Sequence, residues 1–210
     1  MFISFEGIDF AGKTTQLEKL RAWFEERGEN VETLREPGGT ALGERIRELL
    51  LSAAHEDMTE SAELFLFSAA RAQLTRAKIE PALRDGRVVL IDRYYDSTTA
   101  YQGYGRGLPL DEIEILNRAA TGGTNPDLTF ILDLDFDASR RRQAERDDGA
   151  TDRIESADRD FFERVRNGYL TIADDEPDRA RVIDATGSIE TIHEIVVRET
   201  ERRYAERKNS

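Results

Sequence analysis

Hydrophobic residues are distributed along the chain in two alternating patterns. Short runs of mostly β-branched, aromatic and leucine residues are separated by longer stretches in which apolar residues recur every three or four positions. The short runs predict strands at residues 2–6, 31–35, 87–92, 128–134 and 181–184. The longer stretches predict helices at residues 14–27, 41–52, 59–84, 110–120, 138–146, 158–174 and 189–207. This alternation predicts an α/β protein with a mostly parallel, helix-covered sheet.

The first predicted helix shows the pattern most clearly. Leu17, Leu20 and Phe24 fall on one face, and Gly28 is placed to end the helix with a left-handed residue. Together with the strands on either side, residues 14–27 therefore form a predicted βαβ unit. The sequence shows no internal repeat, linker or low-complexity tract, so we expect one domain over residues 1–210.

Two stretches follow neither pattern and are predicted to be loops. Residues 96–108 are rich in glycine and hydroxyl groups, and residues 146–155 are almost wholly polar. Loops that follow the carboxyl ends of parallel strands are where such sheets bind ligands. Both stretches are therefore candidates for a binding site.

A glycine-rich segment directly follows the first predicted strand. It reads Gly7-Ile8-Asp9-Phe10-Ala11-Gly12-Lys13-Thr14-Thr15 and fits the pattern G-x-x-x-x-G-K-[ST]. Glycines allow backbone N–H groups to curl around an anion, and the positive end of the following helix dipole favours the same charge. Lys13 is then expected to reach the β- and γ-phosphates of a nucleotide, and the Thr14 hydroxyl to bind Mg²⁺.

A magnesium site at this loop needs a carboxylate at the end of a neighbouring strand. Asp92 ends one apolar run and Asp133 ends another, so both are candidates, and either could instead cap a turn. We prefer Asp92 because Arg93 follows it, and an arginine beside a metal-linked carboxylate suits a second phosphate group.

Composition limits the partners of the chain. The 210 residues carry a formal net charge of −13 and include no cysteine, which rules out disulfides. A strongly acidic protein repels phosphate backbones, so we expect no nucleic acid as a polymer partner. No apolar run approaches the roughly 18 residues that a membrane span needs, and a signal peptide is not recognisable, which predicts a cytoplasmic protein without a membrane partner.

Of the 30 basic residues only Lys13, Lys19, Lys78 and Lys208 are lysines. This bias is typical of halophile proteins, and equally of an acidic protein with arginine-biased codons.

Several segments together resemble thymidylate kinases over nearly the whole chain. They are FEGIDFAGKTT, LREPGGT, LFSAARAQL, DRYYDSTTAYQGYGRG, NPDLTFILDLD and DRIE. The resemblance implies a three-layer P-loop kinase fold, with a five-stranded parallel sheet in the order 2-3-1-4-5, helices on both faces and a mobile lid at about residues 140–156. It also implies transfer of the γ-phosphoryl of ATP to dTMP with Mg²⁺, in dTTP biosynthesis.

The same resemblance assigns an acceptor site. It implies that Phe67 stacks on thymine, that Arg71 binds an exocyclic oxygen of the base, and that Arg93 binds the acceptor phosphate. Asp9 would bond the sugar 3′-hydroxyl, and Tyr101 is a candidate guard against a 2′-hydroxyl. The remaining residues expected to shape the pocket are Glu36, Pro37, Ser97, Thr98 and Gln102. An acceptor phosphate is already ionised, so alignment and charge neutralisation suffice without a strong general base.

Arginines surround the second polar stretch. The resemblance makes Arg142 a candidate for stacking on adenine, and Arg146 and Arg153 candidates for the catalytic cation over the triphosphate. Family members that lack an arginine after the P-loop aspartate rely on the lid for this charge, and this chain has Phe10 there. Asp147 and Asp148 lengthen the lid, so the choice between Arg146 and Arg153 stays open.

The sequence therefore predicts a cytoplasmic dTMP kinase. Two alternatives remain: another small P-loop phosphotransferase with a different acceptor, and a nucleotide-dependent switch or binding module. The Asn-Lys-x-Asp segment with which GTP switches read guanine is absent. The family resemblance further implies a homodimer, for which the predicted helix at residues 59–84 could supply the interface.

Overall fold

The computed structural model describes residues 1–146 and 153–208 and contains a five-stranded parallel sheet. The strands are β1 (Phe2–Glu6), β2 (Val31–Arg35), β3 (Val88–Asp92), β4 (Leu128–Asp133) and β5 (Ala180–Asp184). Their order is β2-β3-β1-β4-β5, which confirms the predicted sheet. Because all strands are parallel, their carboxyl ends meet at one edge of the sheet.

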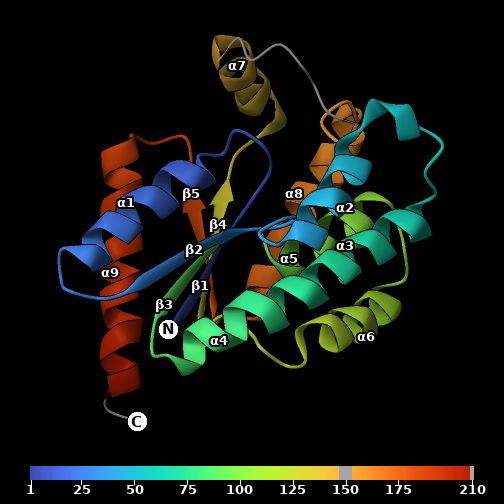
Figure 1. The fold of residues 1–210 in the computed structure, drawn as a ribbon. Helices are drawn as coiled ribbons and strands as arrows, with labels where there is room; N and C mark the ends of the chain where they lie inside the picture. The colour runs from blue at the N-terminus through green and yellow to red at the C-terminus, as the bar shows by residue number, and fades with distance from the viewer. Residues whose placement is uncertain (147–152, 209–210) are drawn as a thin grey trace.

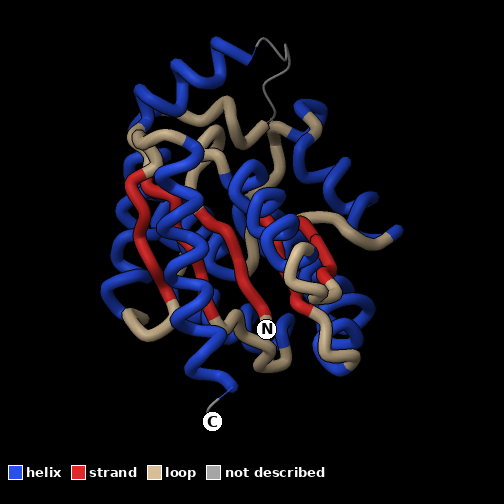
Figure 2. The backbone as a smooth tube through the Cα atoms, turned by 90° about the vertical axis from the view of Figure 1, so that its left-hand side faces the viewer, coloured by secondary structure: helices blue, strands red, loops and turns tan. Residues whose placement is uncertain are grey.

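Helices connect the strands and cover both faces of the sheet. They are α1 (Lys13–Glu25), α2 (Ala41–Leu51), α3 (Glu60–Leu74), α4 (Glu80–Arg84), α5 (Tyr95–Thr98), α6 (Leu110–Thr121), α7 (Phe136–Arg146), α8 (Arg159–Asp175) and α9 (Ile189–Lys208). Helices α1 and α9 pack side by side on one face, and α8 and α4 pack against the other (Figures 1 and 2). Helix α7 stands above the carboxyl edge of the sheet, over β4 and β5 (Figure 1).

The core follows the alternation of side chains along β1. Ile3 and Phe5 join the large cluster that contains Leu17 and Leu20 of α1, whereas Phe2 joins a smaller cluster on the opposite face. Every residue of β1 is buried, as expected for a central strand with helices on both sides. The predicted apolar face of the first helix is confirmed.

The stretch at residues 96–108 corrects a prediction. It is mostly helical rather than irregular, because α5 continues directly into a π-helix at Thr99–Gly105. Its glycines serve close packing: a Cβ at Gly103 would lie 2.6 Å from Leu110, and one at Gly105 would lie 2.7 Å from Phe161. A glycine-rich composition therefore indicated contact between helices here and not a turn.

The predicted long helix at residues 59–84 exists as a continuous helical run with an altered middle. A π-helix at Thr75–Ile79 separates α3 from α4 and ends two residues before Pro81. Proline lacks the N–H that an α-helix needs at this point, and a local π turn accommodates the missing bond. Of the second polar stretch, residues 147–152 lie outside the described residues.

Candidate active site

The loop between β1 and α1 has the geometry of a phosphate cradle. Gly7 has φ 129°, and a Cβ there would lie 2.5 Å from the carbonyl oxygen of Leu132. Gly12, at φ 94°, is the N-cap residue directly before α1. Both positions require glycine, because L side chains rarely adopt these dihedrals. Residues Asp9 to Thr15 line a cleft of about 1080 Å³, so the predicted loop faces open space. Gly7 and Ile8, the first two residues of the loop, do not line that space.

Lys13 lies at the centre of this loop. Its side chain is folded back so that Nζ donates a hydrogen bond to the Ile8 carbonyl oxygen at 2.9 Å. Burial, and secondly the nearby positive charge of Arg93, lower the pKa of Lys13. A bound phosphate would stabilise the charged form, because it would add negative charge next to Lys13.

Thr14 and Asp92 lie together at the end of β3. The Thr14 hydroxyl donates a hydrogen bond to Asp92 Oδ2 at 2.7 Å. The rival carboxylate, Asp133, instead receives two hydrogen bonds from Arg166, at 2.6 and 2.7 Å. The pairing leaves Asp92 as the carboxylate next to the loop hydroxyl.

Arg93 connects the phosphate loop to the rest of the site. Its backbone is in the left-handed region, at φ 67°, a conformation that costs free energy in a non-glycine residue. From there the guanidinium donates to the Gly7 carbonyl oxygen at 2.9 Å and to Asp9 Oδ1 at 2.7 Å. It also contacts the hydroxyl groups of Tyr101 at 3.1 Å and Tyr169 at 3.2 Å. Arg93 thus connects the phosphate loop to Tyr101 and Tyr169.

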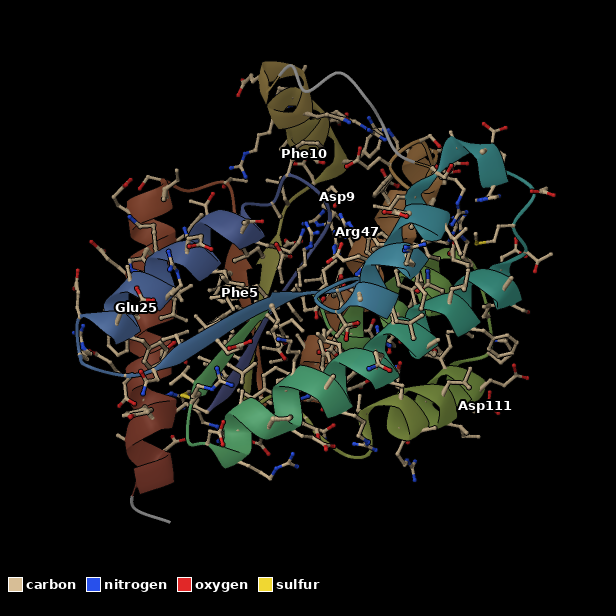
Figure 3. All side chains as sticks on the ribbon, in the orientation of Figure 1. Phe5, Asp9, Phe10, Glu25, Arg47 and Asp111 are labelled. Carbon is tan, nitrogen blue, oxygen red and sulfur yellow. The ribbon has the colours of Figure 1, made fainter. Side chains whose placement is uncertain are left out.

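Asp9 faces this guanidinium and is ionised. Burial by itself would raise the pKa of Asp9, but the charges of Arg93 and Lys13 outweigh it and the pKa is lowered. Asp9 is thereby a fixed acceptor, and Tyr101 Oη donates to its other oxygen at 3.4 Å. Asp9 and Arg47 of α2, both labelled in Figure 3, line the same cleft and the same adjoining cavity.

Tyr169 contacts Arg93, and Glu6 in turn bonds Tyr169. Neither residue was predicted from the sequence. Glu6 Oε1 accepts the Tyr94 backbone N–H at 2.7 Å, and Oε2 lies 2.6 Å from Ser97 Oγ and 3.1 Å from Tyr169 Oη. Burial raises the pKa of Glu6 to about 8, with the nearby Asp96 adding to the effect. A charged residue at the end of a fully buried strand was the one available signal for Glu6.

The cavity next to Arg93 gathers most of the predicted acceptor residues. Its wall contains Asp9, Glu36, Pro37, Phe67, Arg93, Ser97, Thr98, Tyr101 and Gln102. It also contains Arg47, Leu51 and Ile154, which sequence reasoning missed. Arg47 lines both this cavity and the cleft at the phosphate loop, and its Nη1 donates to the Pro37 carbonyl oxygen at 3.1 Å. Arg47 is one of two arginines in α2, and neither carries a local signal that would have singled it out.

Arg71 is the predicted acceptor residue that does not line this cavity. It is buried, and its Nε donates to Glu36 at 2.8 Å, with further bonds to Asn117 at 2.9 Å and Thr98 at 2.8 Å. Burial raises the pKa of Glu36 to about 7 despite this partner. Within residues 1–146 and 153–208, the other carboxyl oxygen of Glu36 has no hydrogen-bond partner. It is a buried polar atom on a cavity wall that a ligand could satisfy.

The arginines around the lid lie in different places. Arg142 of α7 lines the cleft and donates to the Phe10 carbonyl oxygen at 3.2 Å and the Ala185 carbonyl oxygen at 2.6 Å. Arg142 thus links α7 to the phosphate loop and to the loop after β5. Figure 3 shows Phe10 of the phosphate loop just below α7. Arg153 is not brought to the phosphate loop: it forms an ion pair with Glu63 and donates to the Leu50 carbonyl oxygen at 3.0 Å. Arg146 ends α7, and its side chain lies outside the described residues.

A glycine-bounded phosphate loop, a lysine on it and a hydroxyl–carboxylate pair beside it define a P-loop phosphotransferase. Comparisons with known proteins make this class more specific. The family model described as thymidylate kinase matches residues 5–196. The chain therefore belongs to the thymidylate kinase family.

Named relatives agree with this assignment over more than nine tenths of the chain. It is 52% identical to a thymidylate kinase of Chlorobaculum parvum over 92% of both chains. It is 48% identical to one of Kosmotoga olearia, over 95% of this chain and 94% of the relative. The crystal structure of thymidylate kinase from Ehrlichia chaffeensis superimposes with a TM-score of 0.77 at 36% identity, covering 96% of this chain and 98% of that one.

Proposed function

We propose that this chain transfers the γ-phosphoryl of ATP to dTMP, giving ADP and dTDP. The observation that carries the proposal is the position of Arg93, which bonds Gly7 and Asp9 of the phosphate loop and lines the acceptor cavity with its own side chain. The cleft and the cavity share Asp9, Glu36, Arg47 and Arg93 on their walls, so donor and acceptor phosphates would meet there.

In this arrangement the acceptor phosphate oxygen attacks the γ-phosphorus. The bond to the β–γ bridging oxygen breaks, and ADP leaves with that electron pair. Lys13 and Arg93 are placed to neutralise charge on the two phosphates, and the rigid pairing of Arg93 with Asp9 holds the guanidinium in place. The reaction needs no general base because the attacking oxygen is already ionised.

The wall of the acceptor cavity suits a deoxynucleoside monophosphate. Phe67 supplies an aromatic face for a base, and Tyr101 lines the same cavity with its hydroxyl on Asp9, the residue proposed to bond the sugar. Ser97, Thr98 and Gln102 supply polar contacts, and Pro37 closes one side. Arg71 reaches the base only if its buried bonds rearrange, so in this structure it acts through Glu36 and Thr98.

Thr14 and Asp92 fit a magnesium ion. Mg²⁺ binds to one or two carboxylates and a hydroxyl, and completes its shell with phosphate oxygens and water. In the part of the chain that the structure describes, no cluster of three or more acidic, histidine or cysteine side chains could hold a metal. A pair that borrows ligands from the nucleotide is the type of site that Thr14 and Asp92 form. Bound there, Mg²⁺ would neutralise charge on the phosphates.

The lid arginines complete the site. Arg142 bonds both the phosphate loop and the loop after β5, and we propose that adenine stacks on it there. The catalytic cation is Arg146 or Arg153, and Arg153 would have to leave Glu63 to reach the triphosphate. Delivery of such a cation by a closing segment would also exclude water from the transfer.

A homodimer is the proposed assembly. Phe65 of α3 is 58% exposed, and Leu42 and Leu49 of the neighbouring α2 are also exposed. These side chains give the α2–α3 side of the molecule apolar surface that a second copy would cover.

None of the helices in residues 1–146 and 153–208 is long and apolar enough to cross a membrane. Cytoplasmic location and adaptation to high salt stay predictions from composition.

The experiment that tests the proposed function is an ADP-release assay with a panel of nucleoside monophosphates. We expect the highest kcat/KM with dTMP. Equal or higher kcat/KM with dCMP, GMP or AMP would contradict the proposal and favour a different acceptor.

A further inference from the structure

Glu63 of α3 is a buried carboxylate that binds three side chains at the edge of the acceptor cavity. Gln102 Nε2 donates to Oε1 at 2.8 Å. Arg106 donates to both oxygens at 3.2 Å, and Arg153 donates to Oε2. The Glu63 side chain is only 2% exposed. Of these partners, Gln102 alone lines the cavity.

The two arginines keep this carboxylate ionised. Burial alone would raise the pKa of Glu63, but the hydrogen bonds from Arg106 and Gln102, together with the charges of the arginines, lower it. A buried ionised carboxylate with such partners accepts hydrogen bonds and donates none. An amide beside this carboxylate must therefore point its NH₂ group, and not its carbonyl oxygen, toward it.

This fixes which end of the Gln102 amide can meet a ligand. The NH₂ end is held by Glu63, so the carbonyl oxygen is the end left for the cavity. If the amide turned over, Oε1 would face the Glu63 oxygens and repel them, and the hydrogen bond would be lost. Gln102 is therefore held as an acceptor on a wall that also carries Phe67.

We propose that Glu63 is a positioning residue that selects the base: by holding Gln102 as an acceptor, it favours bases with an N–H at ring position 3. Thymine and uracil carry a hydrogen at N3, whereas cytosine presents an unprotonated N3 that is itself an acceptor. With cytosine at this wall, two hydrogen-bond acceptors, its N3 and the Gln102 carbonyl oxygen, would face each other. A site built around a hydrogen bond strongly rejects a ligand that leaves a buried polar group unpaired. The inference rests on the proposed function, since it assumes a base against Phe67 and Gln102.

The test measures kcat/KM of Glu63→Gln with dTMP, dUMP and dCMP. A glutamine at position 63 can donate as well as accept, so Gln102 is free to turn. We expect the dTMP/dCMP ratio to fall by on the order of ten- to a hundredfold. The dTMP/dUMP ratio should stay within about twofold, because both bases carry the N3 hydrogen. An unchanged dTMP/dCMP ratio, or an equal fall in both ratios, would overturn the inference.

A matched variant separates the amide from the ion pairs. Arg106→Gln removes one cation from Glu63 but leaves the carboxylate and its bond to Gln102, so its dTMP/dCMP ratio should remain that of the wild type. A fall as large as that of Glu63→Gln would assign the effect to the ion pairs and contradict the proposal.

Two further arms keep the test decisive. If Glu63→Gln does not fold, as judged by its thermal transition, Glu63→Asp retains the charge but shortens the reach to Gln102, and its dTMP/dCMP ratio should also fall. An unchanged ratio there overturns the inference. A wild-type enzyme that does not prefer dTMP to dCMP would contradict the proposed function itself, whereas a selective wild type with an unaffected position 63 contradicts only the role of Glu63.

Discussion

Arg93 Nη2 lies 2.7 Å from Asp9 Oδ1, and this ion pair joins the end of β3 to the phosphate loop. The Asp9 side chain is 28% exposed and that of Arg93 16%, so the pair is partly desolvated and open to a ligand. The same guanidinium donates to the Gly7 carbonyl oxygen. Several bonds therefore set its orientation before any substrate binds, which is the preorganisation that phosphoryl transfer requires.

Replacing Arg93 with lysine should show the value of this geometry. Lysine keeps the charge but cannot bond Asp9, Gly7 and an acceptor phosphate at once. We expect Arg93→Lys to lower kcat/KM for dTMP by about 10²-fold or more. Steady-state kinetics would measure it, with Arg118→Lys, a substitution in an exposed pair on α6, as the control. A near-normal kcat/KM would remove Arg93 from the transfer step.

Glu6 should make stability depend on pH. Its pKa is about 8 in the folded protein against an ordinary value of 4.5, so the folded state binds more protons than the unfolded state between these values. The free energy of unfolding should therefore fall as pH rises from about 5 to 8. Glu6→Gln imitates the protonated form and should flatten this part of the curve.

Urea denaturation at several pH values would measure the effect of Glu6. The control is Glu114→Gln, on the exposed surface of α6, whose curve should run parallel to that of the wild type. Parallel curves for wild type and Glu6→Gln would mean that Glu6 titrates normally.

Asp92 and Asp133 should differ in their effect on magnesium dependence. Asp92 is next to the Thr14 hydroxyl, whereas Asp133 is paired with Arg166. We expect Asp92→Asn to raise the Mg²⁺ concentration for half-maximal activity on the order of tenfold or more. Asp133→Asn should leave it unchanged. A magnesium titration of activity for both variants decides between the two carboxylates, and the reverse result would assign the metal to Asp133.

Arg146 and Arg153 can be separated by kinetics. Arg153 is held by Glu63 near the acceptor cavity. We therefore expect Arg153→Ala to raise KM for dTMP by a larger factor than it lowers kcat, and also to lower the melting temperature. Arg146→Ala should lower kcat with little change in KM. A large loss of kcat at unchanged KM in Arg153→Ala would instead make Arg153 the catalytic cation, delivered on lid closure.

The apolar surface of α2 and α3 should control assembly. Phe65→Glu places a charge at the most exposed apolar side chain of α3 and should shift a dimer to monomer in sedimentation velocity. Ile115→Glu, on the exposed surface of α6, tests how far the interface extends. A wild-type protein that sediments as a monomer would reject the dimer.

Elements with strong local signals were predictable. The strands start and end within one residue of the prediction, because β1, β3 and β4 are short, largely apolar runs and β2 and β5 are short runs that contain β-branched residues. The phosphate loop was predictable for the same reason, since its chemistry depends on residues adjacent in sequence. Residues 96–108 were not, because their glycines are explained by Leu110 and Phe161, which pack on them from other helices.

The sequence by itself determined the strands and the phosphate loop, because hydrophobic period and motif spacing act over short distances. The order of the sheet and most of the acceptor wall followed from the resemblance of its motifs to a known family. Only the tertiary structure decided which side chains complete them. Glu6, Tyr169 and Glu63 act through partners 39 to 163 positions away, and Arg71 and Arg153 are drawn to buried carboxylates rather than to the open cleft. Buried charges must find partners wherever the fold brings them, and no local pattern records that choice.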